Sequence, residues 1–178
     1  MKKGKMSIKE MAYYAILIAL NVVLTRVGSI RIGGGGVEIV RIGFGGYPII
    51  FAGLVFGPLA GGIVGTIGDI IGHFASPMGP YMPHFTMTAA LTGIIPGLIM
   101  MLFKEPKNSF WKLTVAIGVG QIVTSIFLVP YFMKTLFSVP MITTVPGRVI
   151  GQAVHIPLYA FITREIQKRL SVIYAGNY

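Results

Sequence analysis

Arg148, Gln152 and His155 are three polar residues that follow one another at helical spacing in an apolar stretch. Residues three and four positions apart lie on the same face of a helix. A guanidinium presents its N–H donors in a planar fork that matches a carboxylate. Arg26 and Arg41 fall near the same predicted end of the molecule. This set favours a ligand that bears a carboxylate over arginines that only reach the membrane surface.

Two other chemistries find less support in the sequence. Asp69 and His73 are one helical turn apart, but the chain has no H-E-x-x-H motif and no compact cluster of metal ligands. Ser125 and His155 could in principle form the pair of an intramembrane serine protease, but neither has a recognisable surround. We therefore expect no metal site, no catalytic site and no enzyme. Asp69 is expected to pair with nearby backbone or with a basic residue.

The composition places all of these residues in a membrane protein. Of 178 residues, 54% are hydrophobic and only 11% are charged, against about 25% charged in soluble domains. The net charge of +10 would suggest nucleic acid in a soluble chain. Here the basic residues cluster at the ends of apolar runs, so no nucleic-acid partner is expected. The chain has no cysteine, which excludes disulfides and thiolate sites.

Six apolar stretches are long enough to be membrane-spanning helices. The second and third share one long apolar block, which Gly57-Pro58 breaks because proline is costly inside a helix. The expected spans are 11–25, two within 47–74, 85–103, 111–132 and 143–166. The prediction is an all-α membrane protein, a compact bundle of six transmembrane helices in a single domain over 1–178. No A-x-A-like cleavage site follows the first apolar run, so that run is expected to remain as a helix.

Lysine and arginine predict the orientation of the bundle. With both termini cytoplasmic, ten of the 15 basic residues lie inside, as the positive-inside rule requires. Three outer segments, 28–46, 76–84 and 138–148, are rich in Gly and Pro. Irregular backbone at membrane depth is tolerated only beside protein or water. We interpret these segments as the walls and lid of one outward-facing pocket. The run of four glycines at 33–36 lacks a following GK[ST], so a flexible gate is favoured over a phosphate loop.

Ala15 and Ala19 form a small-x-x-x-small pattern in the first predicted helix. Two alanines one turn apart allow another helix to approach closely. That helix could belong to the same bundle or to a partner. The glycines between 57 and 72 have similar spacing, and we expect them to serve packing within the chain.

Several motifs, taken together, are similar to one family over nearly the whole chain. The chain resembles the substrate-binding S components of energy-coupling factor (ECF) vitamin transporters, and is closest to their folate-family group. The matching segments are R-I-G-F at 41–44, F-G-P at 56–58, G-D-I-I-G at 68–72, P-M-G-P-Y-M-P-H-F-T at 77–86, A-A-L-T-G at 89–93 and P-G-R-V-I at 146–150.

The resemblance implies a six-helix bundle whose outer vitamin pocket is capped by the segment after the first helix. It also implies a complex with a transmembrane coupling subunit (EcfT-type) and two cytoplasmic ATPases (EcfA-type), in which the S component topples to deliver its cargo. ATP would be hydrolysed by those partners, so no cofactor is expected on this chain. The face of Ala15 and Ala19 corresponds to the family's contact with the coupling subunit. The expected location is the bacterial cell membrane.

The pocket is expected to use the segment after the first helix, the start of the fourth, the outer half of the fifth and the start of the sixth. Arg148, Arg26 and Arg41 are the candidates for binding an anion. Hydrogen bonds and stacking are assigned to His84, Tyr81, Gln121, Tyr131 and Gln152.

The vitamin itself stays open at this point. The folate-type pattern has Gly where this chain has His84, and Pro where it has Gly147. Folate and pantothenate both offer a carboxylate, whereas cationic thiamine suits an arginine-rich site poorly. The alternatives are a stand-alone carrier or channel, or an intramembrane enzyme. A carrier should show an internal repeat, and the two halves of this sequence do not match convincingly.

Overall fold

The computed structural model describes residues 7–34, 37–77, 80–103 and 109–175, with backbone only for 30–42 and 170–175. This part of the chain holds six helical segments and one hairpin. The helices are α1 (Ile8–Arg26), α2 (Tyr47–Phe56), α3 (Pro58–Ala75), α4 (Pro83–Leu102), α5 (Phe110–Gln121), which continues through the π-helix η1 (Ile122–Leu128) into α6 (Val129–Phe137), and α7 (Met141–Ala175). The six predicted helices are therefore present, each within a few residues of its expected position except at the extended end of α7.

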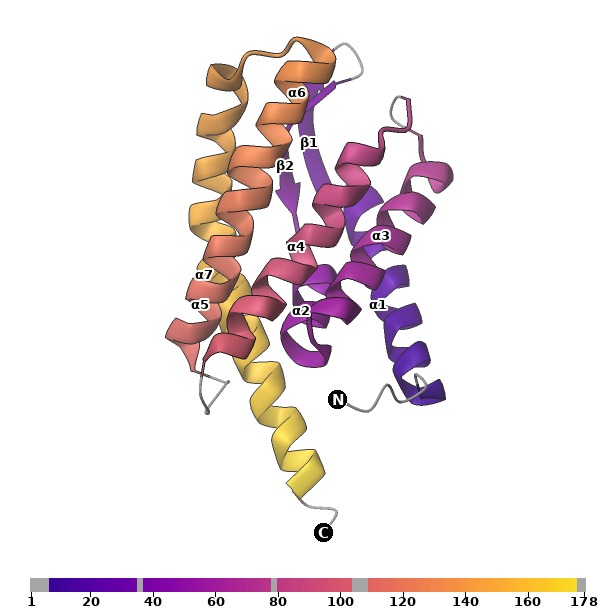
Figure 1. Ribbon diagram of the computed structural model, residues 1–178, viewed down its shortest axis with the longest axis vertical. Coiled ribbons are helices and arrows are strands. Elements are labelled where there is room, and N and C mark those ends of the chain that lie inside the picture. The colour runs from indigo at the N-terminus through magenta and orange to yellow at the C-terminus, as the bar shows by residue number, and fades with distance from the viewer. Residues whose placement is uncertain (1–6, 35–36, 78–79, 104–108, 176–178) are drawn as a thin grey trace.

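The helices form a bundle with α1 and α7 on opposite sides in Figure 1. The first turn of α1 and the last turn of α7 lie at the same end of the bundle, and the hairpin stands toward the other end. Among the described residues, three helices are long and apolar enough to cross a membrane: α1, α4 and the continuous helix Phe110–Phe137. The cytoplasmic position of the termini stays a prediction.

The predicted break between the second and third helices is confirmed. Gly57 separates α2 from α3 and has φ +97°, a region that residues with a side chain rarely adopt. Pro58 follows at the first position of α3, where its missing N–H would have no helical partner in any case. The sharp turn lets α2 and α3 lie against the same neighbour, α4.

Glycines allow α2 and α3 to contact α4 backbone to backbone. A Cβ built on Gly93 of α4 would lie 2.6 Å from the backbone of Gly61 on α3, and one built on Gly97 would lie 2.7 Å from the carbonyl oxygen of Gly53 on α2. Since helix association in lipid depends on close van der Waals contact rather than on a hydrophobic drive, these glycines stabilise the bundle. The predicted role of the glycine series in intrachain packing is confirmed.

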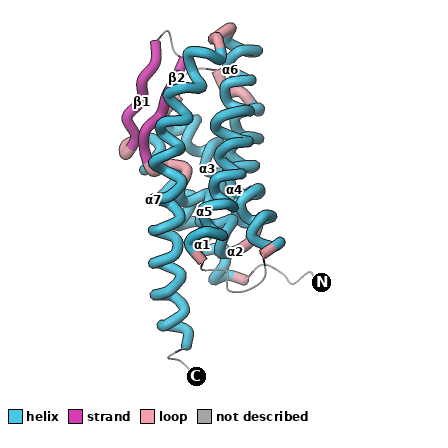
Figure 2. The backbone as a smooth tube through the Cα atoms, turned by 90° about the vertical axis from the view of Figure 1, so that its left-hand side faces the viewer, coloured by secondary structure: helices cyan, strands magenta, loops and turns pink. Residues whose placement is uncertain are grey.

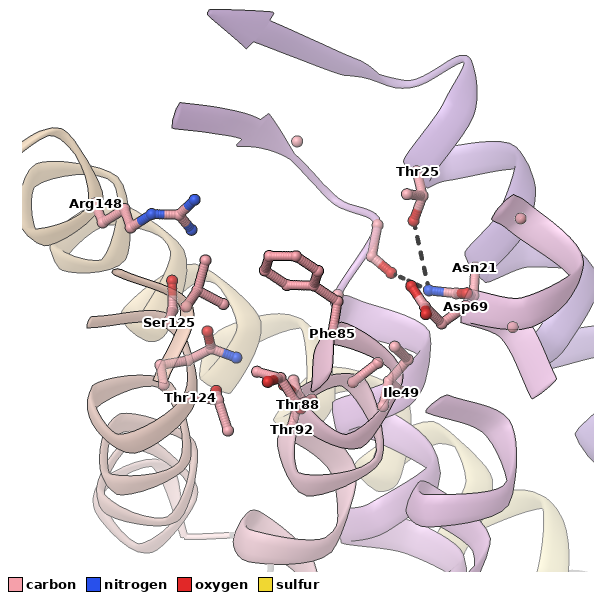
Figure 3. A pocket seen from close by; sticks show the side chains of 18 of the residues that line it. Asn21, Thr25, Ile49, Asp69, Phe85, Thr88, Thr92, Thr124, Ser125 and Arg148 are labelled. Carbon is pink, nitrogen blue, oxygen red and sulfur yellow. Dashed lines mark hydrogen bonds between the residues drawn. The ribbon is translucent and has the colours of Figure 1, made fainter. Parts of the chain in front are cut away.

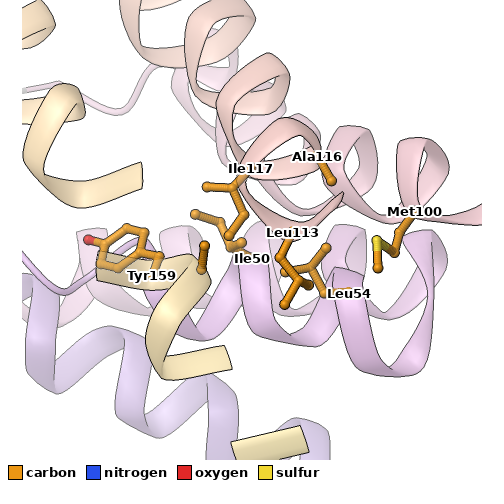
Figure 4. Packing of buried hydrophobic residues seen from close by; sticks show 8 residues of the cluster. Ile50, Leu54, Met100, Leu113, Ala116, Ile117 and Tyr159 are labelled. Carbon is orange, nitrogen blue, oxygen red and sulfur yellow. The ribbon is translucent and has the colours of Figure 1, made fainter. Parts of the chain in front are cut away.

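A hydrophobic cluster fills the bundle near the end where α1 begins. Figure 4 shows its side chains packed between α2, α4, α5 and α7. Its members are Ile50, Leu54, Met100, Leu113, Ala116, Ile117, Tyr159 and Ala160. Side chains fill this end of the bundle closely. The polar cavity described below lies at the other end, toward the hairpin.

The segment after α1 is more regular than the gate we expected. It forms an antiparallel hairpin of β1 (Ser29–Gly34) and β2 (Val37–Gly43), with an irregularity in register between Ile32 and Gly33. The alternation of apolar and polar residues in 37–41 was the signal for a strand. Gly33 and Gly34 lie on β1, while residues 35–36 lie outside the described part. The side view in Figure 2 places this hairpin beside α7.

Two hydrogen bonds anchor the base of the hairpin to the bundle. The Ser29 hydroxyl donates to the Thr25 carbonyl at 2.5 Å, and the Tyr159 hydroxyl donates to the Gly43 carbonyl at 3.0 Å. Each bond joins one strand to a different helix, α1 or α7. The position of the hairpin is therefore fixed at its base, next to the cavity described below.

Candidate functional site

A cavity of about 350 Å³ lies between the base of the hairpin and the helices. Its volume is within the range of small-molecule sites, which runs from about 300 to 1,000 Å³. One wall comes from α1, α3 and α4, and the facing wall from α5, η1, α6 and α7. Figure 3 shows Arg148 and Ser125 on one side, Asn21 and Asp69 on the other, and Phe85 between them.

The α7 wall carries one of the two arginines that line the cavity among the described residues. Arg148 projects from α7 toward the cavity (Figure 3), and its Nη2 lies 3.6 Å from the sulfur of Met133. One turn later, Gln152 donates from Nε2 to the hydroxyl of Ser125 on η1 at 3.0 Å. Its carbonyl oxygen, Oε1, is buried and has no donor within hydrogen-bond distance among the described residues. This wall thus combines a positive charge with an available acceptor.

The π-helix η1 gives the facing wall its polar residues. Val129 N–H donates to the carbonyl of Thr124, five residues back, and Pro130 next to it has no N–H to restore the α-helical ladder. Short π segments of this kind occur frequently at functional sites. Thr124 and Ser125 of η1 line the cavity together with Gln121, the last residue of α5. Gln121 is only 5% exposed, so its amide is enclosed beside the cavity.

The opposite wall is built around two polar side chains. Asn21 of α1 is 5% exposed and donates from Nδ2 to the carbonyl of Gly45 at 2.6 Å. Asp69 of α3 accepts a hydrogen bond from the Thr86 hydroxyl at 2.7 Å. Our expectation that Asp69 would pair with backbone or a basic residue missed this partner, which α4 supplies from another part of the chain.

Aromatic rings line both sides of the cavity. His155 and Tyr159 of α7 stack with ring centroids 5.4 Å apart, and Phe44 lies against both rings. Phe85 of α4 stacks on Phe137 of α6 at 6.3 Å. Flat apolar faces next to a few polar groups are suited to a planar ligand.

Four of the eight binding residues expected from the sequence meet at this cavity. Arg148, Arg26, Gln121 and Gln152 all line it. Arg26 enters from the end of α1, and its Nη1 donates to the Ser76 carbonyl at 2.8 Å. Arg41 lies on β2, but its side chain is outside the described residues.

The other three expected residues lie outside the cavity wall. Tyr131 is 55% exposed on α6. His84 is exposed at the start of α4 and contacts Phe132, with ring centroids 5.0 Å apart. Tyr81 is 39% exposed, and its hydroxyl lies 3.0 Å from that of Thr86, the residue that donates to Asp69. These three residues were expected at the pocket because their segments lie near it. The sequence pattern alone did not determine which face of each helix points toward the cavity.

Several residues of the cavity were missed in the sequence. Thr88 and Thr92 of α4 line it, and their hydroxyls donate to the carbonyls four residues earlier, at 2.8 and 2.9 Å. Each hydroxyl oxygen then remains an acceptor. Polar residues that recur every four positions in an apolar stretch were the available signal. Asn21 in the first apolar run was another.

Ala15 and Ala19 are exposed on α1, on the side of the helix that does not contact the bundle. The inner side of α1 packs through Leu17 and Ile18, next to Ile49 and Val64. In the described part of the chain, no three His, Asp or Glu side chains are grouped so that they could hold a metal ion.

A helical membrane bundle that encloses a polar, aromatic-lined cavity at one end defines a small-molecule-binding membrane component. The comparisons with known proteins specify its family. Residues 5–164 match the family model described as "ECF-type riboflavin transporter, S component". The chain belongs to the S components of ECF-type transporters, a family of multi-pass membrane proteins.

Relatives and solved structures agree on this family. The folate transporter FolT of Clostridium novyi (strain NT) is 30% identical over 155 residues, which cover 87% of this chain and 86% of that protein. A crystal structure of FolT bound with folic acid superposes with a TM-score of 0.73 at 25% identity, covering 89% of this chain and 92% of that one. The S component for biotin shares the fold, with a TM-score of 0.69 at 17% identity over 90% and 92% of the two chains. The predicted S-component fold is confirmed.

Proposed function

We propose that this protein is the folate-capturing S component of an ECF importer. The observation that carries the proposal is the similarity to the Clostridium novyi FolT over most of both chains, together with the FolT structure that holds folic acid. The matching family model is described for riboflavin, but the relatives reported above favour folate. Pantothenate, which the sequence left open, receives no support from them.

The cavity has groups that suit folic acid. Folic acid carries a planar pteridine, an aromatic ring and a glutamate with two carboxylates. Arg148 supplies a cation for a carboxylate, where a charged hydrogen bond is worth about 1.5–3 kcal/mol. The ring pairs His155–Tyr159 and Phe85–Phe137 supply faces for the planar parts. The hairpin of β1 and β2, anchored at the rim by Gly43, would cap the bound vitamin.

In the same proposal, delivery depends on other subunits. The chain would dock through α1 onto an EcfT-type coupling subunit, and two EcfA-type ATPases would hydrolyse ATP in the cytoplasm. This chain would then act as a binding subunit rather than as an enzyme, and would need no cofactor. Its location would be the bacterial plasma membrane, with both termini in the cytoplasm. The alternative is a stand-alone carrier. Membership of the S-component family makes this alternative less favoured.

A ligand panel tests the proposed substrate. The purified chain in detergent is titrated with folic acid, riboflavin, biotin and pantothenate by calorimetry. We expect one folic acid to bind per chain, at least about a hundredfold tighter than any of the other three vitamins, because specificity is a difference between affinities. Tighter binding of riboflavin or biotin would contradict the folate assignment and would leave the family intact.

A further inference from the structure

Asp69 is an acidic residue in the wall of the cavity that the proposed function does not yet use. It lies on α3, in the middle of a helix whose neighbouring positions are glycine or apolar. A carboxylate in such a place is costly unless it is satisfied by partners. Its role therefore needs an explanation from its contacts.

Two hydroxyl groups, linked by a hydrogen bond, lie on the side of the Asp69 carboxylate away from the cavity. Thr86 Oγ1 donates to Asp69 Oδ2 at 2.7 Å. Thr86 has a single hydroxyl proton, so the 3.0 Å contact between Thr86 and Tyr81 is a hydrogen bond donated by the Tyr81 phenol. Thr86 is 7% exposed and, like Tyr81, is not part of the cavity wall. Both hydroxyls therefore orient the carboxylate without occupying its cavity side.

The cavity side of Asp69 retains the capacity to accept hydrogen bonds. Among the residues that the structure describes, no side chain or backbone group donates to Oδ1. A carboxylate offers about four lone-pair positions, and Thr86 occupies one of them. Asn21, which lies on the same side of the cavity in Figure 3, directs its amide nitrogen to the Gly45 carbonyl.

The two ends of the cavity therefore differ in chemistry. Arg148 and Gln152 lie on the α7 side, while Asp69 lies on the α3 side with Phe85 between them (Figure 3). Arg26 and His73 also line the α3 side, but Nη1 of Arg26 donates to the Ser76 carbonyl at the end of α3. A ligand with a carboxylate at one end and adjacent N–H donors at the other would satisfy both walls.

We propose that Asp69 determines specificity by accepting hydrogen bonds from the N–H donors of the ligand's planar head. The inference rests on the proposed function, because folic acid has such a head. Its 2-amino group and the neighbouring ring N–H present two parallel donors, which a carboxylate accepts in bidentate fashion.

The test compares folic acid with 2-desamino-folic acid, in which hydrogen replaces the 2-amino group. In the wild-type chain we expect folic acid to bind at least about tenfold tighter, because loss of one donor leaves the carboxylate partly unpaired. In Asp69→Asn the Thr86 contact survives, but an NH₂ group now faces the donors. We expect folic acid to bind about 10- to 100-fold more weakly and the preference between the two ligands to disappear.

Glu165→Gln is the matched control, because it also removes one negative charge. Glu165 forms an exposed ion pair with Lys168 at 2.9 Å near the end of α7, away from the cavity. Both ligands should bind this variant as they bind the wild type. Retained binding of 2-desamino-folic acid by Asp69→Asn would show that the variant is folded.

Two results would overturn the assignment of Asp69 while the proposed function stands. One is equal affinity of the wild-type chain for both ligands, which needs no variant to be stable. The other is an Asp69→Asn variant whose preference for folic acid is unchanged. A wild-type chain that binds neither ligand would overturn the proposed function itself and this inference with it.

Discussion

Replacing Ala15 and Ala19 together by tryptophan should abolish ATP-dependent folate uptake by the full transporter and leave folate binding by the isolated subunit unchanged. Both alanines are exposed on α1, and the cavity is formed by other positions. Two indole rings would prevent the close helix contact that small residues permit. The measurement is uptake into proteoliposomes that contain the complete complex, alongside titration of the purified subunit.

Ala153→Trp provides the matched control for this experiment. Ala153 is exposed on α7, so the same change in volume is made on a face with no proposed partner. Uptake should persist in this variant. If the double α1 variant also keeps its uptake, the face of Ala15 and Ala19 contacts only lipid. If it loses binding as well, the alanines serve the bundle itself, and the proposed docking face is wrong.

Arg148→Ala should weaken folate binding by about 10- to 150-fold, equivalent to about 1.5–3 kcal/mol for a hydrogen bond to a charged group. The guanidinium lines the cavity, and its Nη2 lies 3.6 Å from the sulfur of Met133. A guanidinium that faces the cavity can form charged hydrogen bonds with a ligand carboxylate. The measurement is calorimetric titration of the purified variant with folic acid.

Arg169→Ala, an exposed arginine near the end of the same helix, controls for the loss of positive charge. It should bind folic acid as the wild type does. Unchanged affinity in Arg148→Ala, with the fold retained, would remove Arg148 from the site. In that case Arg26, which lines the same cavity, would become the leading candidate for the carboxylate.

Features of the sequence that depend on local spacing predicted the structure well. Apolar runs gave the six helices, and Gly57-Pro58 gave the break between two of them, because the rules for helix length and for proline are local. Arg148 and Gln152 line the same cavity, since four residues separate them on one helix. Each of these features can be predicted without knowing how the neighbouring helices pack.

Features that depend on how helices face one another were harder to predict. His84, Tyr81 and Tyr131 belong to segments near the cavity but do not line it. Whether a residue faces the cavity depends on the rotation of its helix, which packing contacts such as Gly61 against Gly93 decide. The contact of Asp69 with Thr86 joins residues 17 positions apart on two helices. No local pattern encodes such a pairing.

Native mass spectrometry of the protein purified from cells supplied with folate tests the central claim most directly. The cavity lies between two walls of the bundle, and a vitamin that binds there tightly should be released slowly, because affinity differences lie mostly in the dissociation rate. We predict a species whose mass exceeds that of the chain by one folic acid, or one reduced folate, and which disappears in Arg148→Ala. A chain that retains riboflavin, biotin or another compound, or that stays unliganded when folic acid is added in excess, would contradict the folate assignment.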